Sequence, residues 1–233
     1  MNKDLELENY LSISPNKFGI YLFDKKNLKN LYKEELILNN NSKFIKLDDL
    51  KKFLDNNIFQ IEKLTGKFVE NIFLICDDKE ILNLEIGIKK KNYNDFITKK
   101  YLENLLIEAK DLFRENYPNH EIIHMIVNKY YINYKNYLLF EDNIKSDHLA
   151  LEINFKSIST SIINDFNKIL ENYQIKILKF LDENYVKSFF NKDLDLPMMS
   201  HKILNGFNAN EVSFIVKNPK KSSFFEKFFQ LFS

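Results

Sequence analysis

The sequence predicts an α+β protein with two small mixed sheets and flanking helices. Several short segments alternate apolar with polar residues, which is typical of half-buried strands. Others repeat apolar residues at spacings of three and four, which indicates amphipathic helices. These segments follow one another as ββαβ and then βαββαβ, an order that favours two small sheets side by side. Hydrophobic residues make up 45% of the 233-residue chain, enough to build a core.

The expected strands differ in how they are buried. FGIYLFD and LYKEELIL, joined by the lysine-rich KKNLKN, predict a hairpin. NIFLIC (71–76) is a continuous apolar run and indicates a strand covered on both faces. The remaining strands are expected at 82–88, at 121–132 with a short turn back through NYLLF, at 149–155, and at 173–180. Residues 1–14 carry little pattern.

Three helices are expected between these strands. The first carries apolar residues from Leu47 to Ile61 and ends at Gly66, a residue that suits a helix C-terminus. The second opens at Thr98, which can cap its first turn, and runs to Phe113. The third follows the hydroxyl-rich residues 159–161.

The chain divides into four predicted parts. After Phe190 the periodic pattern dissolves into a polar stretch with two prolines and a glycine, which predicts a flexible linker. The sequence ends on KKSSFFEKFFQLFS. Because this stretch is apolar, we expect it to dock on the protein's own core, on a partner or on a membrane. The predicted parts are a first domain at 15–76, a second domain at 77–188, the linker at 191–221, and a C-terminal helix at 222–233.

Bulk composition narrows the class of protein. Thirty-four basic residues balance thirty-three acidic ones, so the chain lacks the net positive charge of a general nucleic-acid binder. Cys76 is the only cysteine, which excludes a disulfide framework and suits a reducing compartment. The acidic N-terminus has no signal-peptide pattern, and no apolar run has the length of a membrane span. We therefore expect a cytosolic protein, or one held at a membrane from the cytosolic side.

No pattern in the sequence predicts catalysis. Nucleophile-elbow, zinc-protease and phosphate-loop motifs do not occur, and there are only four glycines from which to build a phosphate cradle. His120 and His124 would share a face of a strand, but a third metal ligand is not near them in sequence. Ser146, Asp147 and His148 are merely adjacent, which does not make a triad. We expect no catalytic, cofactor-binding or metal-binding residues, with an unrecognised enzyme as the remaining alternative.

The C-terminal stretch predicts a membrane-binding helix. Placed at 100° per residue, its large apolar residues fall on one arc and its polar residues on the other. Ser222 or Ser223 can cap the helix, and nearby lysines suit an anionic lipid surface. The expected membrane-binding residues are Phe224, Phe225, Phe228, Phe229, Leu231, Phe232, Lys220, Lys221 and Lys227. Two alternatives stay open, in which the helix packs on the protein's own core or in a groove of a partner.

The middle of the chain resembles the FtsA family of bacterial cell-division proteins. HMIVNKYYIN (124–133) is similar to the family pattern H-x-I-P-x-x-Y-x-I-D, with Val127 in place of proline and Asn133 in place of aspartate. FITKKYLENLLIEAKD resembles the family's Ile-Thr-led helix, and HLALEINFKSIS with the following helix and strand keeps the same order. The resemblance covers about residues 45–188. The matching residues are His124, Ile126, Tyr130, Ile132, Ile97, Thr98 and Ala109.

The resemblance implies a shortened actin-like protein. Residues 15–76 would be part of the first actin-like subdomain, and the second domain would be the strand-helix-strand-strand insert of the family. PNKFGIYLFDK lacks the family's Asp-x-Gly phosphate loop, and the second lobe is missing. ATP binding is therefore not expected, and FtsZ binding is in question because its surface belongs to that lobe. The family also ends in a linker and an amphipathic membrane-targeting helix.

Two functions follow as hypotheses. The first is a non-enzymatic adaptor of the bacterial cell-division machinery, tethered by its C-terminal helix to the cytoplasmic face of the inner membrane. Its expected partners are the membrane surface, other division proteins and further copies of itself. The second is a soluble protein-binding module of actin-like ancestry, of the kind used in pilus assembly, whose C-terminal helix packs on its own core.

Overall fold

The computed structural model describes residues 6–38, 45–77, 79, 81–190 and 194–213. Their contacts divide the chain into two compact units. Unit 1 combines the described residues up to Leu82 with Asn119–Ile123 and Lys156–Asn205. Unit 2 combines Asn83–Pro118, His124–Phe155 and the described residues from Gly206 onward. The chain is α+β with one sheet in each unit, which confirms the predicted fold class.

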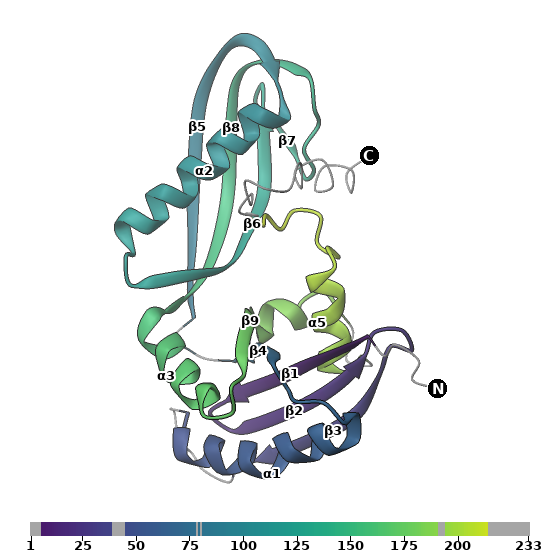
Figure 1. The fold of residues 1–233 in the computed structure, drawn as a ribbon. Helices are drawn as coiled ribbons and strands as arrows, with labels where there is room; N and C mark the ends of the chain where they lie inside the picture. The colour runs from purple at the N-terminus through teal and green to yellow at the C-terminus, as the bar shows by residue number, and fades with distance from the viewer. Residues whose placement is uncertain (1–5, 39–44, 78, 80, 191–193, 214–233) are drawn as a thin grey trace, which may run out of the picture. The chain divides into compact units, whose positions relative to one another are not determined.

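Unit 1 is built on a five-stranded mixed sheet in the order β3-β2-β1-β4-β9 (Figure 1). β2 pairs antiparallel with both of its neighbours, whereas β4 runs parallel to β1 and to β9. β2 is therefore the one strand of this sheet that opposes the others. The strands are β1 (Leu7–Ser14), β2 (Lys17–Asp24), β3 (Lys29–Ile37), β4 (Asn71–Cys76) and β9 (Lys176–Asp182).

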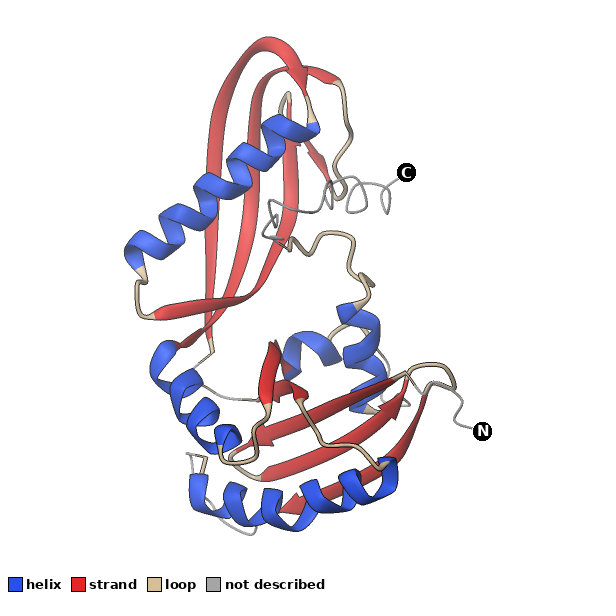
Figure 2. Ribbon diagram, in the orientation of Figure 1, coloured by secondary structure: helices blue, strands red, loops and turns tan. Residues whose placement is uncertain are grey.

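Helices cover both faces of this sheet (Figure 2). α1 (Leu47–Thr65) and α3 (Thr160–Glu171) bury Leu54, Phe166 and their neighbours in one core with alternate residues of β1, β2 and β4. On the opposite face, α5 (Leu196–Leu204) lies over β2, with His201 beside Phe23, and α4 (Glu183–Lys187) packs against α5 and β9. This two-sided burial explains why NIFLIC in β4 is a continuous apolar run.

Unit 2 holds a four-stranded sheet in the order β5-β8-β6-β7, packed against α2. α2 (Lys99–Asn116) begins at Thr98, whose side chain accepts a hydrogen bond from the Tyr101 amide, as expected from the sequence. Its Phe113 stacks on Phe155 of β8 with ring centroids 5.1 Å apart. The strands are β5 (Leu82–Ile97), β6 (His120–Ile132), β7 (Lys135–Tyr137) and β8 (Ile144–Ser159).

The division into units differs from the predicted one in two respects. β1 lies in the stretch where the sequence shows little pattern, and it is the central strand of unit 1. α3 and β9 belong to unit 1, although the sequence analysis assigns them to the second domain. Parallel strands such as β4 and β9 are joined through long crossovers, so sequence neighbours need not share a sheet.

The flexible linker predicted for 191–221 is wrong at Leu196–Leu204, where the chain forms α5. Asp195 caps this helix by accepting from the Met198 amide, and Pro197 occupies its first turn, where a proline is tolerated. Pro197, Met199 and Ile203 are buried. The segment reads as a linker because its proline looks like a helix breaker and its nine residues carry too short a pattern. The predicted C-terminal helix at 222–233 lies outside the described residues.

Candidate functional site

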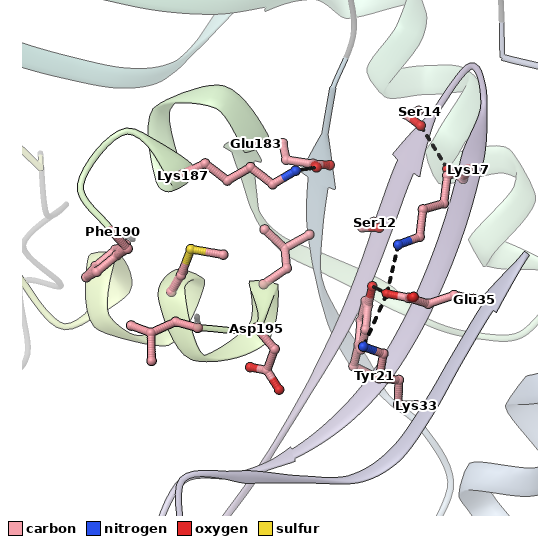
Figure 3. A pocket seen from close by; sticks show the side chains of 13 residues that line it. Ser12, Ser14, Lys17, Tyr21, Lys33, Glu35, Glu183, Lys187, Phe190 and Asp195 are labelled. Carbon is pink, nitrogen blue, oxygen red and sulfur yellow. Dashed lines mark hydrogen bonds and ion pairs between the residues drawn. The ribbon is translucent and has the colours of Figure 1, made fainter. Parts of the chain in front are cut away.

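Unit 1 contains an open pocket of about 600 Å³ between the β1–β3 strands and the α4–α5 segment (Figure 3). Its strand side carries hydroxyl, lysine and carboxylate groups. Its opposite side carries four apolar side chains together with Glu183, Lys187 and Asp195. The pocket is lined by Ser12, Ser14, Lys17, Tyr21, Lys33, Glu35, Glu183, Lys187, Phe190, Leu194, Asp195, Leu196 and Met199.

Glu35 is the centre of the polar side of this pocket. Its Oε1 accepts a hydrogen bond from the Tyr21 hydroxyl at 2.7 Å and pairs with the Lys17 Nζ at 2.9 Å and the Lys33 Nζ at 3.5 Å. A second ion pair joins Lys187 to Glu183 on α4. The lysines of the pocket are therefore matched by carboxylates of the same pocket, rather than left as a free cationic cradle.

The pKa values of Glu35 and Tyr21 are shifted in opposite directions, away from neutral pH. Burial by itself would raise the pKa of Glu35, but the hydrogen bonds from Tyr21 and Lys17 outweigh it and lower that pKa below its ordinary value. Burial, reinforced by Glu35, raises the pKa of the Tyr21 phenol. Since general acid–base catalysis works best with a pKa near the working pH, this pair is poorly suited to proton transfer.

Gly19 allows Tyr21 to reach Glu35. The two residues Gly19 and Tyr21 share a face of β2, and a Cβ on Gly19 would lie 2.4 Å from the Tyr21 hydroxyl oxygen and 2.8 Å from its ring. The tyrosine side chain thus folds back over the bare backbone of Gly19. This close approach explains a glycine in the middle of a strand.

We expect Gly19→Ala to displace Tyr21 and to destabilise unit 1 by about 1–3 kcal/mol, the usual cost of overpacking. Urea denaturation followed by circular dichroism measures the change. Gly87→Ala in β5 is the matched control, because its Cβ would meet no atom within 4 Å. If both variants lose the same amount of stability, the loss at Gly19 does not come from contact with Tyr21, and the explanation is wrong.

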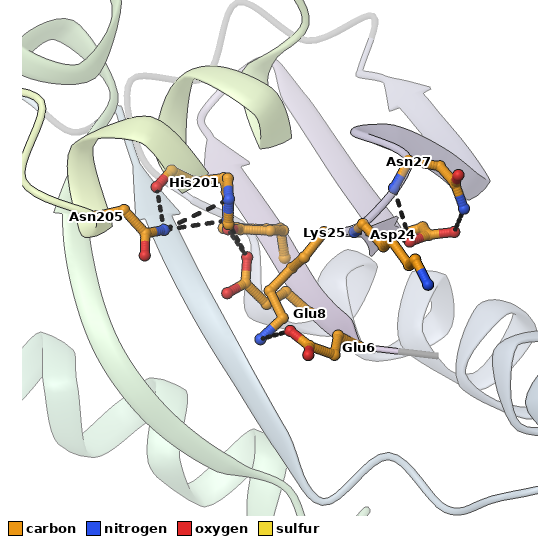
Figure 4. A network of polar contacts seen from close by, with 9 residues as sticks. Glu6, Glu8, Asp24, Lys25, Asn27, His201 and Asn205 are labelled. Carbon is orange, nitrogen blue, oxygen red and sulfur yellow. Dashed lines mark hydrogen bonds and ion pairs between the residues drawn. The ribbon is translucent and has the colours of Figure 1, made fainter. Parts of the chain in front are cut away.

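A polar network fixes α5 to the sheet and so shapes the apolar wall of the pocket (Figure 4). Glu8 of β1 accepts hydrogen bonds from the Tyr10 hydroxyl at 2.6 Å and from the His201 Nδ1 at 2.8 Å. The His201 ring also lies 5.4 Å from the Phe23 ring. At the start of α5, the Asn30 amide donates to Asp195 at 2.6 Å. Contacts from β1, β2 and β3 thus hold the nine-residue helix α5 on the sheet.

The same network includes the turn after β2. The Asn27 amide side chain donates to Asp24 at 2.6 Å, and the backbone amides of Lys26 and Asn27 donate to the same carboxylate. The Asn27 side chain is the main cause that lowers the pKa of Asp24. Asp24 therefore stays ionised and shapes the β2–β3 connection.

Unit 2 has an exposed aromatic surface at one end of its sheet. Tyr93 is 85% exposed, Tyr134 is 86% exposed, and Phe96 is 52% exposed. We name these three residues the tyrosine end. Asn92 and Asn133, which precede the two tyrosines, both donate to backbone carbonyls of residues 145–146 at the start of β8, at 3.1 and 3.0 Å. These bonds bring the part of β5 that carries Tyr93 and the turn that carries Tyr134 to the same strand.

The backbone of the tyrosine end is strained. Tyr93 and Tyr134 have φ of 49° and 64°, in the left-handed region that favours glycine and asparagine. Asn133 and Tyr134 form the two-residue connection between β6 and β7, both at positive φ. Asn-Gly would fit such a turn without strain. A bulky exposed aromatic at these positions thus costs stability, which is a frequent property of functional positions.

The residues that the sequence singles out for chemistry have structural roles where the structure describes them. His124 is buried against Glu211, and Ser146 donates within the turn that holds Asn133. Cys76 is buried in β4. Among the described residues no group of three or more metal-ligating side chains occurs, and no helix of that part is long and apolar enough to cross a membrane. The nine expected membrane-binding residues, from Lys220 to Phe232, lie outside the described part of the chain.

Sequence reasoning missed the tyrosine end and the pocket. Tyr93 and Tyr134 read as ordinary strand or turn residues, and only the asparagines beside each of them could have indicated a left-handed turn. The pocket joins Glu35 to residues of α4 and α5 that lie far along the chain. No spacing of residues in the sequence indicates that these side chains line one pocket.

Comparison with known proteins gives structural likeness at low sequence identity. No family model and no curated protein matches the chain. The structure of a PilM–PilN type IV pilus biogenesis complex matches with a TM-score of 0.48 and 7% identity, covering 78% of this chain and 49% of that one. The cytoplasmic domain of EpsL, an inner membrane component of the type II secretion system of Vibrio cholerae, matches with a TM-score of 0.34 and 8% identity, covering 78% and 57%.

A third structure, from Bacteroides thetaiotaomicron, is described as a protein with an actin-like ATPase fold and unknown function. It matches with a TM-score of 0.31 and 14% identity, covering 81% of this chain and 59% of that one. The chain thus spans about half to three-fifths of the length of these structures.

Proposed function

We propose that the chain is a non-enzymatic adaptor that binds a partner protein through the tyrosine end of unit 2. The observation that carries the proposal is the pair of tyrosines, each more than four-fifths exposed and held at a left-handed backbone position. Tyrosine supplies a large, rigid contact area with few rotatable bonds, and it is enriched at protein interfaces. The strain would be offset when a partner covers the rings.

This function keeps the protein binding of the module expected from the sequence, without the division-site role of the first hypothesis. In the pocket of unit 1, a lowered pKa keeps Glu35 ionised and a raised pKa keeps Tyr21 protonated, so this pair is poorly suited to proton transfer. Pilus-biogenesis and secretion-system assemblies, such as those named for the similar structures, are where we would first seek the partner. A role in cell division with FtsA-like partners stays a prediction.

Site-specific photo-crosslinking in cells tests the proposal. A photoreactive phenylalanine at Tyr134 should give one dominant crosslinked protein, whereas the same group at Phe68 in unit 1 should not. Phe68 is a matched control because it is also 85% exposed, but its backbone is not at positive φ. A crosslink to the same protein from both positions, or from Phe68 alone, would refute the assignment of the tyrosine end as the binding surface.

We further propose that the C-terminal helix expected at 222–233 holds the adaptor to the membrane. Its six apolar residues and its lysines would bind an anionic interface reversibly. In a co-sedimentation assay, the intact chain should pellet with anionic vesicles, and a chain lacking 222–233 should stay in the supernatant. If the intact chain also stays in solution, the helix serves the protein's own core or a partner, and the tether is wrong.

A further inference from the structure

β6 has a hydrogen-bonding edge that β7 leaves open. β6 lies between β8 and β7 in the sheet of unit 2. β7, however, pairs only with Tyr130, Tyr131 and Ile132 at the end of the thirteen-residue strand. The earlier part of the same edge, around Ile126, is therefore able to accept another strand.

The chain fills this edge with a short segment from far along the sequence, Asn208–Val212. Val127 donates its amide to the Asn210 carbonyl at 3.0 Å, and Val212 donates to the Met125 carbonyl at 2.8 Å. Between them, Ile126 and Glu211 form an antiparallel bridge. The Asn210 side chain adds a bond to the Leu138 carbonyl at 2.8 Å. The segment thus pairs with β6 as an added strand would, although it forms only an isolated bridge and not a regular strand.

One side-chain pair marks this added strand. Glu211 Oε1 lies 2.8 Å from His124 Nδ1, and the side chains of His124 and Glu211 are only 0% and 8% exposed. A buried imidazole facing a carboxylate is a selective contact, because a strand without the carboxylate would leave the imidazole without that charge-assisted bond. The edge of β6 therefore discriminates among strands by one acidic side chain.

The segment is short and lies between exposed residues. It follows α5 of unit 1 through Gly206, which has φ of +82°. Phe207 and Ser213, which flank the segment, are exposed. A short strand whose contacts include two backbone bonds and the buried contact of Glu211 with His124 can be replaced by a strand of the same chemistry.

We propose that the β6 edge at Met125–Val127 is a strand-docking site for an extended partner segment that carries a carboxylate opposite His124. In the free chain Asn208–Val212 occupies the site and shields the edge. The proposal rests on the proposed adaptor function, and it adds a second, sequence-selective contact for the partner. The edge is distinct from the tyrosine end, so the two contacts can be tested separately.

The test uses the full chain and a labelled peptide, GFNANEVS, copied from residues 206–213. In the intact chain the built-in segment competes at high effective concentration, so the peptide should bind weakly. The double variant Glu211→Gln with Val212→Pro removes the carboxylate and one backbone donor, and should open the edge. We expect this variant to bind the peptide at least tenfold more tightly than the intact chain does, measured by fluorescence polarisation.

Two controls make the result decisive. A peptide with glutamine at the Glu211 position should bind the double variant at least tenfold more weakly. Hydrogen exchange at the Val127 amide reports the edge directly, because this amide donates to Asn210. Its exchange should speed up in the double variant and slow again when the peptide is added. Glu211→Gln alone, which keeps every backbone bond, should give a smaller change in the same direction.

Three results would overturn the proposal. The first is equal binding of the two peptides, which would remove the role of His124. The second is no peptide binding by a double variant whose remaining unit 2 amides stay protected. The third is an intact chain that forms a dimer and loses Val127 protection on dilution, since a second copy would then fill the edge. None of these results bears on crosslinking at Tyr134, so the adaptor function would stand or fall independently.

Discussion

Replacing Ile203 by aspartate is expected to destabilise unit 1 by about 3–5 kcal/mol, because the change removes a buried aliphatic side chain and places an unpaired carboxylate in the same space. Ile203 is 3% exposed on the face of α5 that meets the sheet. Each of the two effects alone costs several kcal/mol. Urea denaturation should show the loss, and hydrogen exchange should show faster exchange of β1 and β2 amides.

Lys202→Asp provides the control at the adjacent position of α5. Lys202 is only partly buried, so a carboxylate there stays in contact with water. Its cost should stay below about 1 kcal/mol and should come from a negative charge near the helix C-terminus. If Ile203→Asp were as mild as Lys202→Asp, residues 196–204 would be the flexible linker that the sequence suggested, and α5 would not be part of unit 1.

The parts of the fold that the sequence predicted well are those with long, regular periodicity. α1 and α2 were expected from apolar spacing, with Gly66 and Thr98 at their ends, and both ends are confirmed. Gly66 adopts the left-handed conformation that closes the helix, and Thr98 caps the first turn. Hydrogen bonds of this kind join residues that are close in the sequence, so they can be predicted without a structure.

The parts that could not be predicted depend on residues far apart in the chain. α5 is stable because Glu8 meets His201 and Asn30 meets Asp195, contacts that span 193 and 165 positions. β1 shows a weak pattern because it is central and receives helices on both faces, so its side chains need not alternate. Tertiary contacts thus override a short or irregular local pattern.

The candidate sites illustrate the same limit. The sequence analysis placed function in the terminal phenylalanines, where amphipathic spacing is visible in one short stretch. The tyrosine end instead depends on backbone angles and exposure, since Tyr93 and Tyr134 combine a positive φ with side chains that are more than four-fifths exposed. The pairing of His124 with Glu211 was likewise invisible, because a lone histidine on a strand is equally compatible with a core position.

Tyr134→Gly is expected to stabilise unit 2 while it weakens partner binding. Glycine after Asn133 gives the Asn-Gly pair that is favoured in a two-residue hairpin turn, and it relieves a φ of 64°. Such a backbone angle costs tyrosine roughly 1–3 kcal/mol. Part of this gain is lost because glycine is more flexible in the unfolded chain. We expect a net gain of about 1 kcal/mol in the free energy of unfolding, measured by urea denaturation.

The same substitution removes an exposed ring that we propose as the centre of the interface. Loss of such a hot-spot aromatic typically costs about 2 kcal/mol or more, which corresponds to roughly a thirtyfold weaker Kd. Calorimetry with the protein identified by crosslinking at Tyr134 measures this change, and Phe68→Gly is the control that should leave the Kd unaltered. If the variant is more stable and still binds the partner with the Kd of the intact chain, the Tyr134 ring does not contribute to binding. That result would contradict the assignment of Tyr134 to the interface.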